Sequence, residues 1–168
     1  MKKNKDELYQ IEVSKGKIPT SGKYVIQLIE LILQLLPAKY LVINDLDGAI
    51  GEKLYQMRLP KIMNLKTFKE VAKNTFQFDW GDFYLFDKKS EATKLKKLIE
   101  KIAPHKDFYY KTIPFALTTV RVFDDWTLIV YTNRKEIFSL VKKHYANNII
   151  PTGLLVEGGK ISDLRVYS

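Results

Sequence analysis

Four stretches of the chain carry apolar residues at helical spacing. In residues 22–36 polar side chains recur only at every third or fourth position, which predicts a helix buried on most of its circumference. Asn64 and Ser90 are the expected N-caps of a second and a third helix, and Asn133 with Glu136 forms a capping-box pattern before a fourth. The expected buried face of the second helix comprises Leu65, Phe68, Val71 and Ala72.

Strand-like runs separate these helices. The expected strands are residues 39–43, 52–59, 76–86, 112–122, 126–132, 154–156 and 161–166. We expect a turn at residues 45–48, and a hinge at Gly81, formed by a bulge or a turn, that divides the aromatic run 76–86 into two strand pieces. The last four runs predict two hairpins, one closed by residues 123–125 and the other by the adjacent glycines Gly158 and Gly159. The pattern predicts an α+β domain with about four helices packed on a largely antiparallel sheet.

The first part of the chain differs from the rest. Residues 1–19 are polar, basic and closed by Pro19, so we expect a tail that carries at most a short edge strand around Leu8–Val13. Residues 20–168 have the size and apolar content of a single domain.

The amino-acid composition excludes some kinds of chemistry and indicates where the protein works. The chain has no cysteine, which excludes disulfides and thiolate nucleophiles, and it shows no signal-peptide pattern, so we expect a cytoplasmic protein. The helix at residues 22–36 is too short to span a bilayer, and no membrane association is expected. The formal net charge is +9, and only four of the 28 basic residues are arginine. The excess charge is therefore mostly lysine, spread along the chain.

One short motif suggests an enzyme. The apolar run before Asp45-Leu46-Asp47-Gly48 resembles the opening motif of the haloacid-dehalogenase phosphatases. The resemblance implies that Asp45 attacks phosphorus, that Asp47 acts as general acid and base, and that Mg²⁺ offsets the charge. It covers only residues 42–50, has Ala49 in place of the family threonine, and lacks the later acidic pair in the family's order. A phosphatase is thus an alternative rather than the leading interpretation.

Other catalytic patterns are missing from the sequence. His105 and His144 have no ligand spacing to each other, and the chain contains neither a nucleophile elbow nor a phosphate-binding glycine loop. We therefore predict no cofactor and no metal site, and a non-catalytic protein is favoured.

Two tryptophans stand beside aspartates. The possible binding patch comprises Asp79, Trp80, Asp82, Asp124, Asp125 and Trp126. Because tryptophan is enriched at binding hot spots, the sequence favours a small protein-binding module, of which an inhibitor or immunity protein is one form. The expected partner is another protein. An alternative is binding of single-stranded nucleic acid, in particular RNA, through the lysine-rich surface and sheet aromatics.

Overall fold

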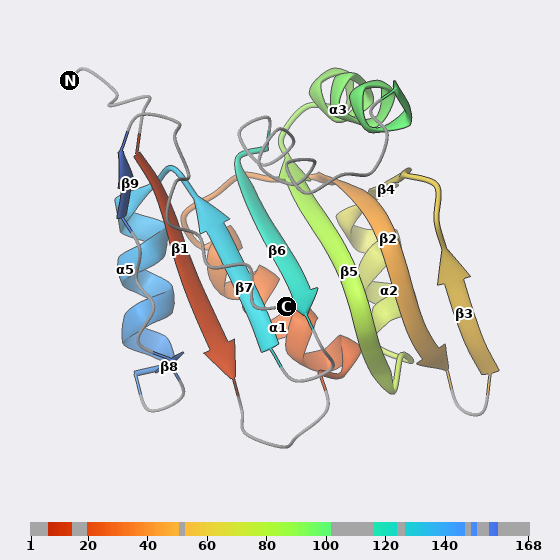
Figure 1. The fold of residues 1–168 in the computed structure, drawn as a ribbon, viewed down its shortest axis with the longest axis horizontal. Coiled ribbons are helices and arrows are strands. Elements are labelled where there is room, and N and C mark those ends of the chain that lie inside the picture. Colours follow the sequence, from red (N-terminus) through yellow and green to blue (C-terminus); the bar gives the residue numbers. More distant parts are fainter. Residues whose placement is uncertain are drawn as a thin grey trace.

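The structure is a computed structural model, and it describes residues 7–14, 20–50, 53–101, 116–123, 127–146, 149–150 and 155–157. The described strands form one nine-stranded sheet in the order β3-β2-β5-β6-β7-β1-β8, with β4 paired to β2 and β9 paired to β1 (Figure 1). Every pairing is antiparallel. The strands are β1 (Glu7–Ser14), β2 (Tyr40–Ile50), β3 (Lys53–Met57), β4 (Lys61–Asn64), β5 (Gln77–Phe86), β6 (Thr118–Phe123), β7 (Thr127–Thr132), β8 (Ile149–Ile150) and β9 (Leu155–Glu157).

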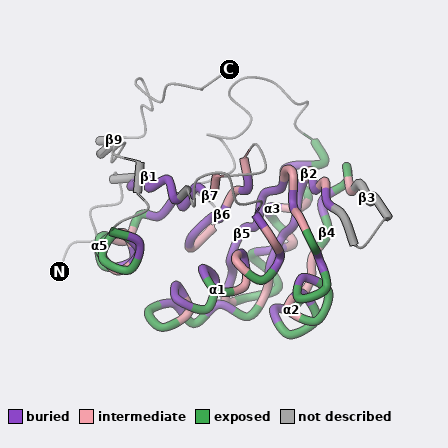
Figure 2. The backbone as a smooth tube through the Cα atoms, turned by 90° about the horizontal axis from the view of Figure 1, so that it is seen from below, coloured by how far each residue is buried: buried purple, intermediate pink, exposed green. Residues whose placement is uncertain are grey.

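Helices cover the two faces of this sheet unequally. The described helices are α1 (Gly22–Leu33), α2 (Leu65–Ala72), α3 (Lys89–Lys101) and α5 (Lys135–His144). Helices α1, α2 and α5 lie along one face and bury the main core, with their outer surfaces exposed (Figures 1 and 2). Helix α3 packs on the opposite face, against Val42, Tyr84 and Phe86. The predicted α+β class, antiparallel sheet and four helices are confirmed.

Helix α1 is the most deeply buried of the helices. The Ser21 side chain accepts a hydrogen bond from the backbone N–H of Tyr24, which caps the first turn. Val25, Leu28 and Ile32 are all fully buried, in agreement with the wide apolar surface that the sequence predicted. Lys69 of α2 forms an ion pair with Glu30, at an N–O distance of 3.0 Å, on the exposed side of the α1–α2 contact.

The two shorter helices differ from the expectations at particular residues. The Asn64 side chain accepts a hydrogen bond from the backbone N–H of Thr67 at 2.7 Å, which confirms the cap of α2. Val71 is 44% exposed, so its predicted burial is wrong, because positions 65, 68 and 72 alone face the sheet. The capping box at Asn133 is also wrong, because α5 begins after Arg134 and has no side-chain cap.

The N-terminal strand lies inside the sheet rather than at its edge. β1 pairs with β7 along six positions and with β8 and β9 on its other side. Its core-facing residues Ile11 and Val13 are both buried in the main core. The edge position expected for Leu8–Val13 is therefore wrong. The polar residues of this segment lie on the sheet face that also carries α3, and in the sequence they resemble the residues of an exposed tail.

At two places where we expected the chain to leave the strand conformation, the structure has a continuous strand. β2 continues through residues 45–48, where we expected a turn, and β5 is continuous through Gly81, where we expected a hinge. The turn at residues 45–48 and the division of the aromatic run at Gly81 are therefore wrong, but the β-bulge expected as one form of the hinge is present in the pairing of β2 with β5 at Gly81. The hairpin formed by β6 and β7 is confirmed in residues 118–123 and 127–132. The expected strand at residues 161–166 lies outside the described residues.

Candidate binding surface on the sheet

A β-bulge interrupts the pairing of β2 with β5. Asn44 is opposite Asp82 and Asp47 is opposite Trp80, so Asp45 and Leu46 together face Gly81. Asp45 has φ 49°, in the left-handed region that aspartate tolerates better than most residues. Leu46 points into the main core, and a Cβ atom at Gly81 would lie 2.6 Å from its Cδ1 atom. Gly81 therefore leaves the space that the bulged leucine occupies.

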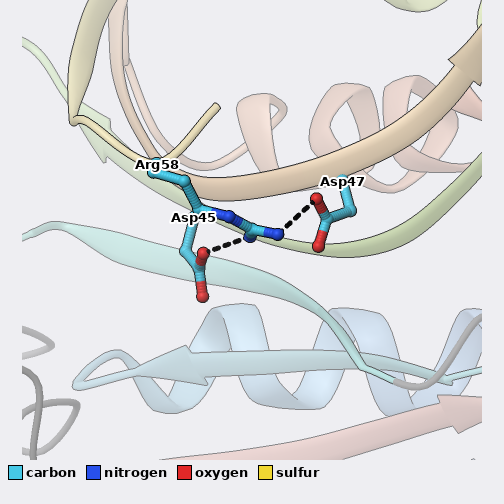
Figure 3. Close-up of polar contacts among 3 residues, drawn as sticks. All are labelled: Asp45, Asp47 and Arg58. Atoms are coloured by element: carbon cyan, nitrogen blue, oxygen red, sulfur yellow. Dashed lines mark hydrogen bonds and ion pairs between the residues drawn. The ribbon is translucent and has the colours of Figure 1, made fainter. Parts of the chain in front are cut away.

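Arg58 joins the two carboxylates of this bulge. It directly follows β3, and its guanidinium lies 2.6 Å from Oδ1 of Asp45 and 2.9 Å from Oδ1 of Asp47 (Figure 3). The hydrogen bond that Arg58 donates to Asp45, followed by the one that it donates to Asp47, raises the pKa of Arg58 above its ordinary value. The Asp45 side chain remains 44% exposed, so one face of this trio is open to solvent.

An aromatic and cationic cluster adjoins the bulge on the face opposite α1. The ring of Trp80 lies 4.9 Å from that of Phe123, measured between centroids. The guanidinium carbon of Arg121 is 4.6 Å from the Trp80 centroid, within cation–π distance. Asp82 is opposite Arg121 in the sheet, and its Oδ1 lies 3.4 Å from Nε. The cluster thus spans β5 and β6 beside the bulge of β2.

These side chains form one continuous surface. We define the bulge surface as Asp45, Asp47, Arg58, Trp80, Arg121 and Phe123. Asp47 is the sheet neighbour of Trp80, which connects the ion-pair trio to the aromatic cluster. Trp80 and Phe123 are each partly exposed.

The structure separates the predicted patch residues. Trp80 and Asp82 share a sheet face, but Asp82 is only 3% exposed. Its carboxylate is buried beside Arg121, with which it forms an ion pair. Asp79 lies at a second register shift, where it accepts a hydrogen bond from the Gln77 side chain at 2.5 Å. Residues 124–126, the other half of the predicted patch, lie outside the described residues.

Sequence reasoning missed three members of the bulge surface. Arg121 and Phe123 alternate with Val120 and Val122, which face the main core, so the alternation of the hairpin could have placed both on the opposite face. No comparable alternation in the sequence indicates the position of Arg58. Its contact with Asp45 depends on β3 pairing back on β2, which no local pattern specifies.

The geometry around Asp45 and Asp47 differs from that of a phosphatase. Both aspartates lie inside a strand of an antiparallel sheet, whereas the family's motif ends a strand. Arg58 already binds both carboxylates. Within the part of the chain that the structure describes, no three histidine, aspartate or glutamate side chains gather as a metal site. These observations do not favour the phosphatase alternative.

Comparisons with known proteins give no further guide. No model of a protein family matches the chain, and no curated protein or solved structure matches it. None of the helices in the described residues is long and apolar enough to cross a membrane. The function is therefore inferred from the chain's own geometry.

Proposed function

We propose that this protein is a non-catalytic module that binds another protein through the bulge surface. The observation that carries the proposal is the partly exposed Trp80, which contacts the guanidinium of Arg121 and the tilted ring of Phe123 on the sheet face opposite α1. Tryptophan and arginine are the residue types most enriched at binding hot spots. An inhibitor or immunity protein is one form of such a module, and the lack of cysteine suits a cytoplasmic location.

Preorganisation of the two arginines supports this proposal. Arg58 is held by two carboxylates, and Arg121 lies against both Trp80 and Asp82. Ordering a long side chain on binding costs about 0.5–1.5 kcal/mol. Arginines that are already positioned lose less of this freedom, so they suit an interface better than solvated lysines do.

The sheet edge next to the bulge is a poorer binding site. β3 and β4 both pair with β2 on its outer side, and residues 58–60 interrupt them. Short strands, a proline and charged residues such as Lys61 are the features that protect an edge from pairing with another chain. We therefore favour recognition by side chains over addition of a partner strand.

The test is affinity purification of the tagged protein from its native cell at low salt and at about 0.5 M salt, where charge screening is strong. Wild-type protein should retain a stoichiometric protein partner at both salt concentrations. Trp80→Ala should weaken binding to the purified partner about 30-fold, in keeping with about 2 kcal/mol at a hot spot. Arg58→Ala, at an exposed position, should weaken it as well.

The matched control is Val71→Ala, which shortens an exposed apolar side chain on α2, on the other face of the sheet. It should bind the partner as the wild type does. Circular dichroism checks that each variant is folded. Equal binding by all four proteins would place the interface elsewhere, and the absence of any stoichiometric partner would contradict the proposal.

A further inference from the structure

Helix α3 presents a row of lysines on its exposed side. Lys94, Lys97 and Lys101 are all exposed, and their spacing of three and four residues places them on one helix face. Ala92, Leu95 and Ile99 are buried on the other side, against the sheet. The helix is therefore fixed on the sheet with its lysine row facing solvent, apart from the other described helices (Figure 1).

None of the described acidic residues forms an ion pair with this lysine row. Within α3, Lys96 forms an ion pair with Glu100 at an N–O distance of 3.4 Å. Among the described residues, no acidic side chain lies within ion-pair distance of Lys94, Lys97 or Lys101. The lysines of α2 differ in this respect, because Lys69 forms an ion pair with Glu30 and Lys73 forms one with Glu70.

The dimensions of the row match those of a phosphate backbone. Residues 94 and 101 are seven residues apart, which corresponds to about 10.5 Å along a helix. A duplex strand carries a phosphate about every 3.4 Å along its axis, so the row faces about three phosphates. Lysine is a hydrated point charge that contacts phosphate without reading base sequence.

We propose that Lys94, Lys97 and Lys101 form a docking face for the phosphate backbone of a nucleic acid. The face includes no residue of the bulge surface, so it is independent of the protein-binding proposal. Charge complementarity carries the inference: three lysines that have no ion-pair partner among the described residues lie in a line on one helix of a chain with net charge +9. Binding of this kind is independent of sequence and falls with salt.

The experiment compares two triple variants that remove the same charge. One carries Lys94→Gln, Lys97→Gln and Lys101→Gln, and the control carries Lys135→Gln, Lys142→Gln and Lys143→Gln on α5, where all three lysines are exposed as well. Fluorescence anisotropy measures the affinity of each protein for a labelled DNA duplex of about 16 base pairs. Titrations at roughly 50–200 mM salt give the slope of log K against log salt.

The α3 variant should lower the magnitude of this slope by about 3, because each phosphate contact contributes about 0.9 in a B-form duplex. Its affinity at about 0.1 M salt should fall on the order of 100-fold, whereas the α5 variant should change both quantities much less. Equal losses in the two variants would overturn the proposal, since they would show an effect of net charge alone. So would a loss for the α3 variant that is confined to vesicles containing phosphatidylserine, since that would identify a membrane surface.

Discussion

Asp45 combines a backbone role with an electrostatic role. Its φ of 49° allows β2 to form the bulge, which turns Leu46 into the core, while its carboxylate binds Arg58. Most non-glycine residues are destabilised in this backbone region, but aspartate and asparagine enter it more readily. A substitution at this position therefore changes the backbone preference and the ion pair together, and a pair of variants is needed to separate the two.

Comparing Asp45→Gly with Asp45→Ala separates these effects. Both remove the carboxylate, but only alanine opposes the positive φ. We expect the glycine variant to be more stable to urea than the alanine variant by about 1 kcal/mol, despite the greater freedom of glycine in the unfolded chain. Equal stabilities, or a more stable alanine variant, would contradict the left-handed conformation of residue 45.

The misplaced turn at residues 45–48 has the same physical origin. Aspartate and glycine favour turns because they tolerate positive φ, and a β-bulge makes the same demand of the backbone. The sequence thus identified the irregular residue but could not distinguish a chain reversal from a bulge. That distinction depends on β3 and β5 pairing with β2 on either side, and these contacts are distant in sequence.

At the scale of single elements, the helix caps offer a paired test. The side chain of Asn64 accepts a hydrogen bond from Thr67 N, whereas α5 has no such bond, and there the Thr132 hydroxyl accepts from Arg134 N. Asn64→Ala should lower the free energy of unfolding by about 1 kcal/mol, and Asn133→Ala should leave it nearly unchanged. Chemical denaturation measures both values. A comparable loss at Asn133 would restore the capping box that the sequence predicted.

The packing of α1 on α2 depends on Gly22. A Cβ atom there would lie 1.8 Å from the carbonyl oxygen of Ala72, and the Gly22 N–H donates to the Thr75 carbonyl at 3.1 Å. Gly22→Ala must move backbone and should cost about 3 kcal/mol in thermal unfolding. Gly81→Ala is the comparison, because the added Cβ would come too close only to the end of the Leu46 side chain, with the Phe83 ring at an ordinary contact distance of 3.5 Å, and it should cost about 1 kcal/mol. The reverse order would show that α1 and α2 are not in contact at this point.

Elements with a strong local pattern were predictable from the sequence. Helix α1, the cap of α2 and the β6–β7 hairpin are encoded by periodicity or by a single capping residue, and the structure has all three. The position of β1 was not predictable, because Gln10 and Glu12 are buried on the second sheet face and read as surface residues. The sequence likewise indicated Trp80 but not Arg121 and Phe123, because these two residues belong to a neighbouring strand and contact Trp80 only in the folded sheet.

At the scale of the whole molecule, β2 and β5 support both proposed surfaces. Val42 and Tyr84 hold α3 near one end of the second sheet face, and Asp47 and Trp80 belong to the bulge surface farther along the same two strands. The two proposed binding surfaces are therefore supported by the same pair of strands. The rigidity of both surfaces depends on the integrity of the whole sheet, in which β1 joins β7 to β8 and β9.

Removal of residues 1–14 tests this integrity. If the segment were a tail, its removal would be harmless, but β1 is an interior strand that buries Ile11 and Val13 in the main core. Each such side chain contributes about 1.5–3 kcal/mol, and the pairing with β7 is lost as well, against a typical total stability of about 5–15 kcal/mol. The truncated chain should show no cooperative urea transition in tryptophan fluorescence, whereas Ile11→Ala should keep one and lose about 3 kcal/mol. A truncated chain that unfolds at the wild-type midpoint would mean that β1 is dispensable and that the sheet is complete from β7 onward.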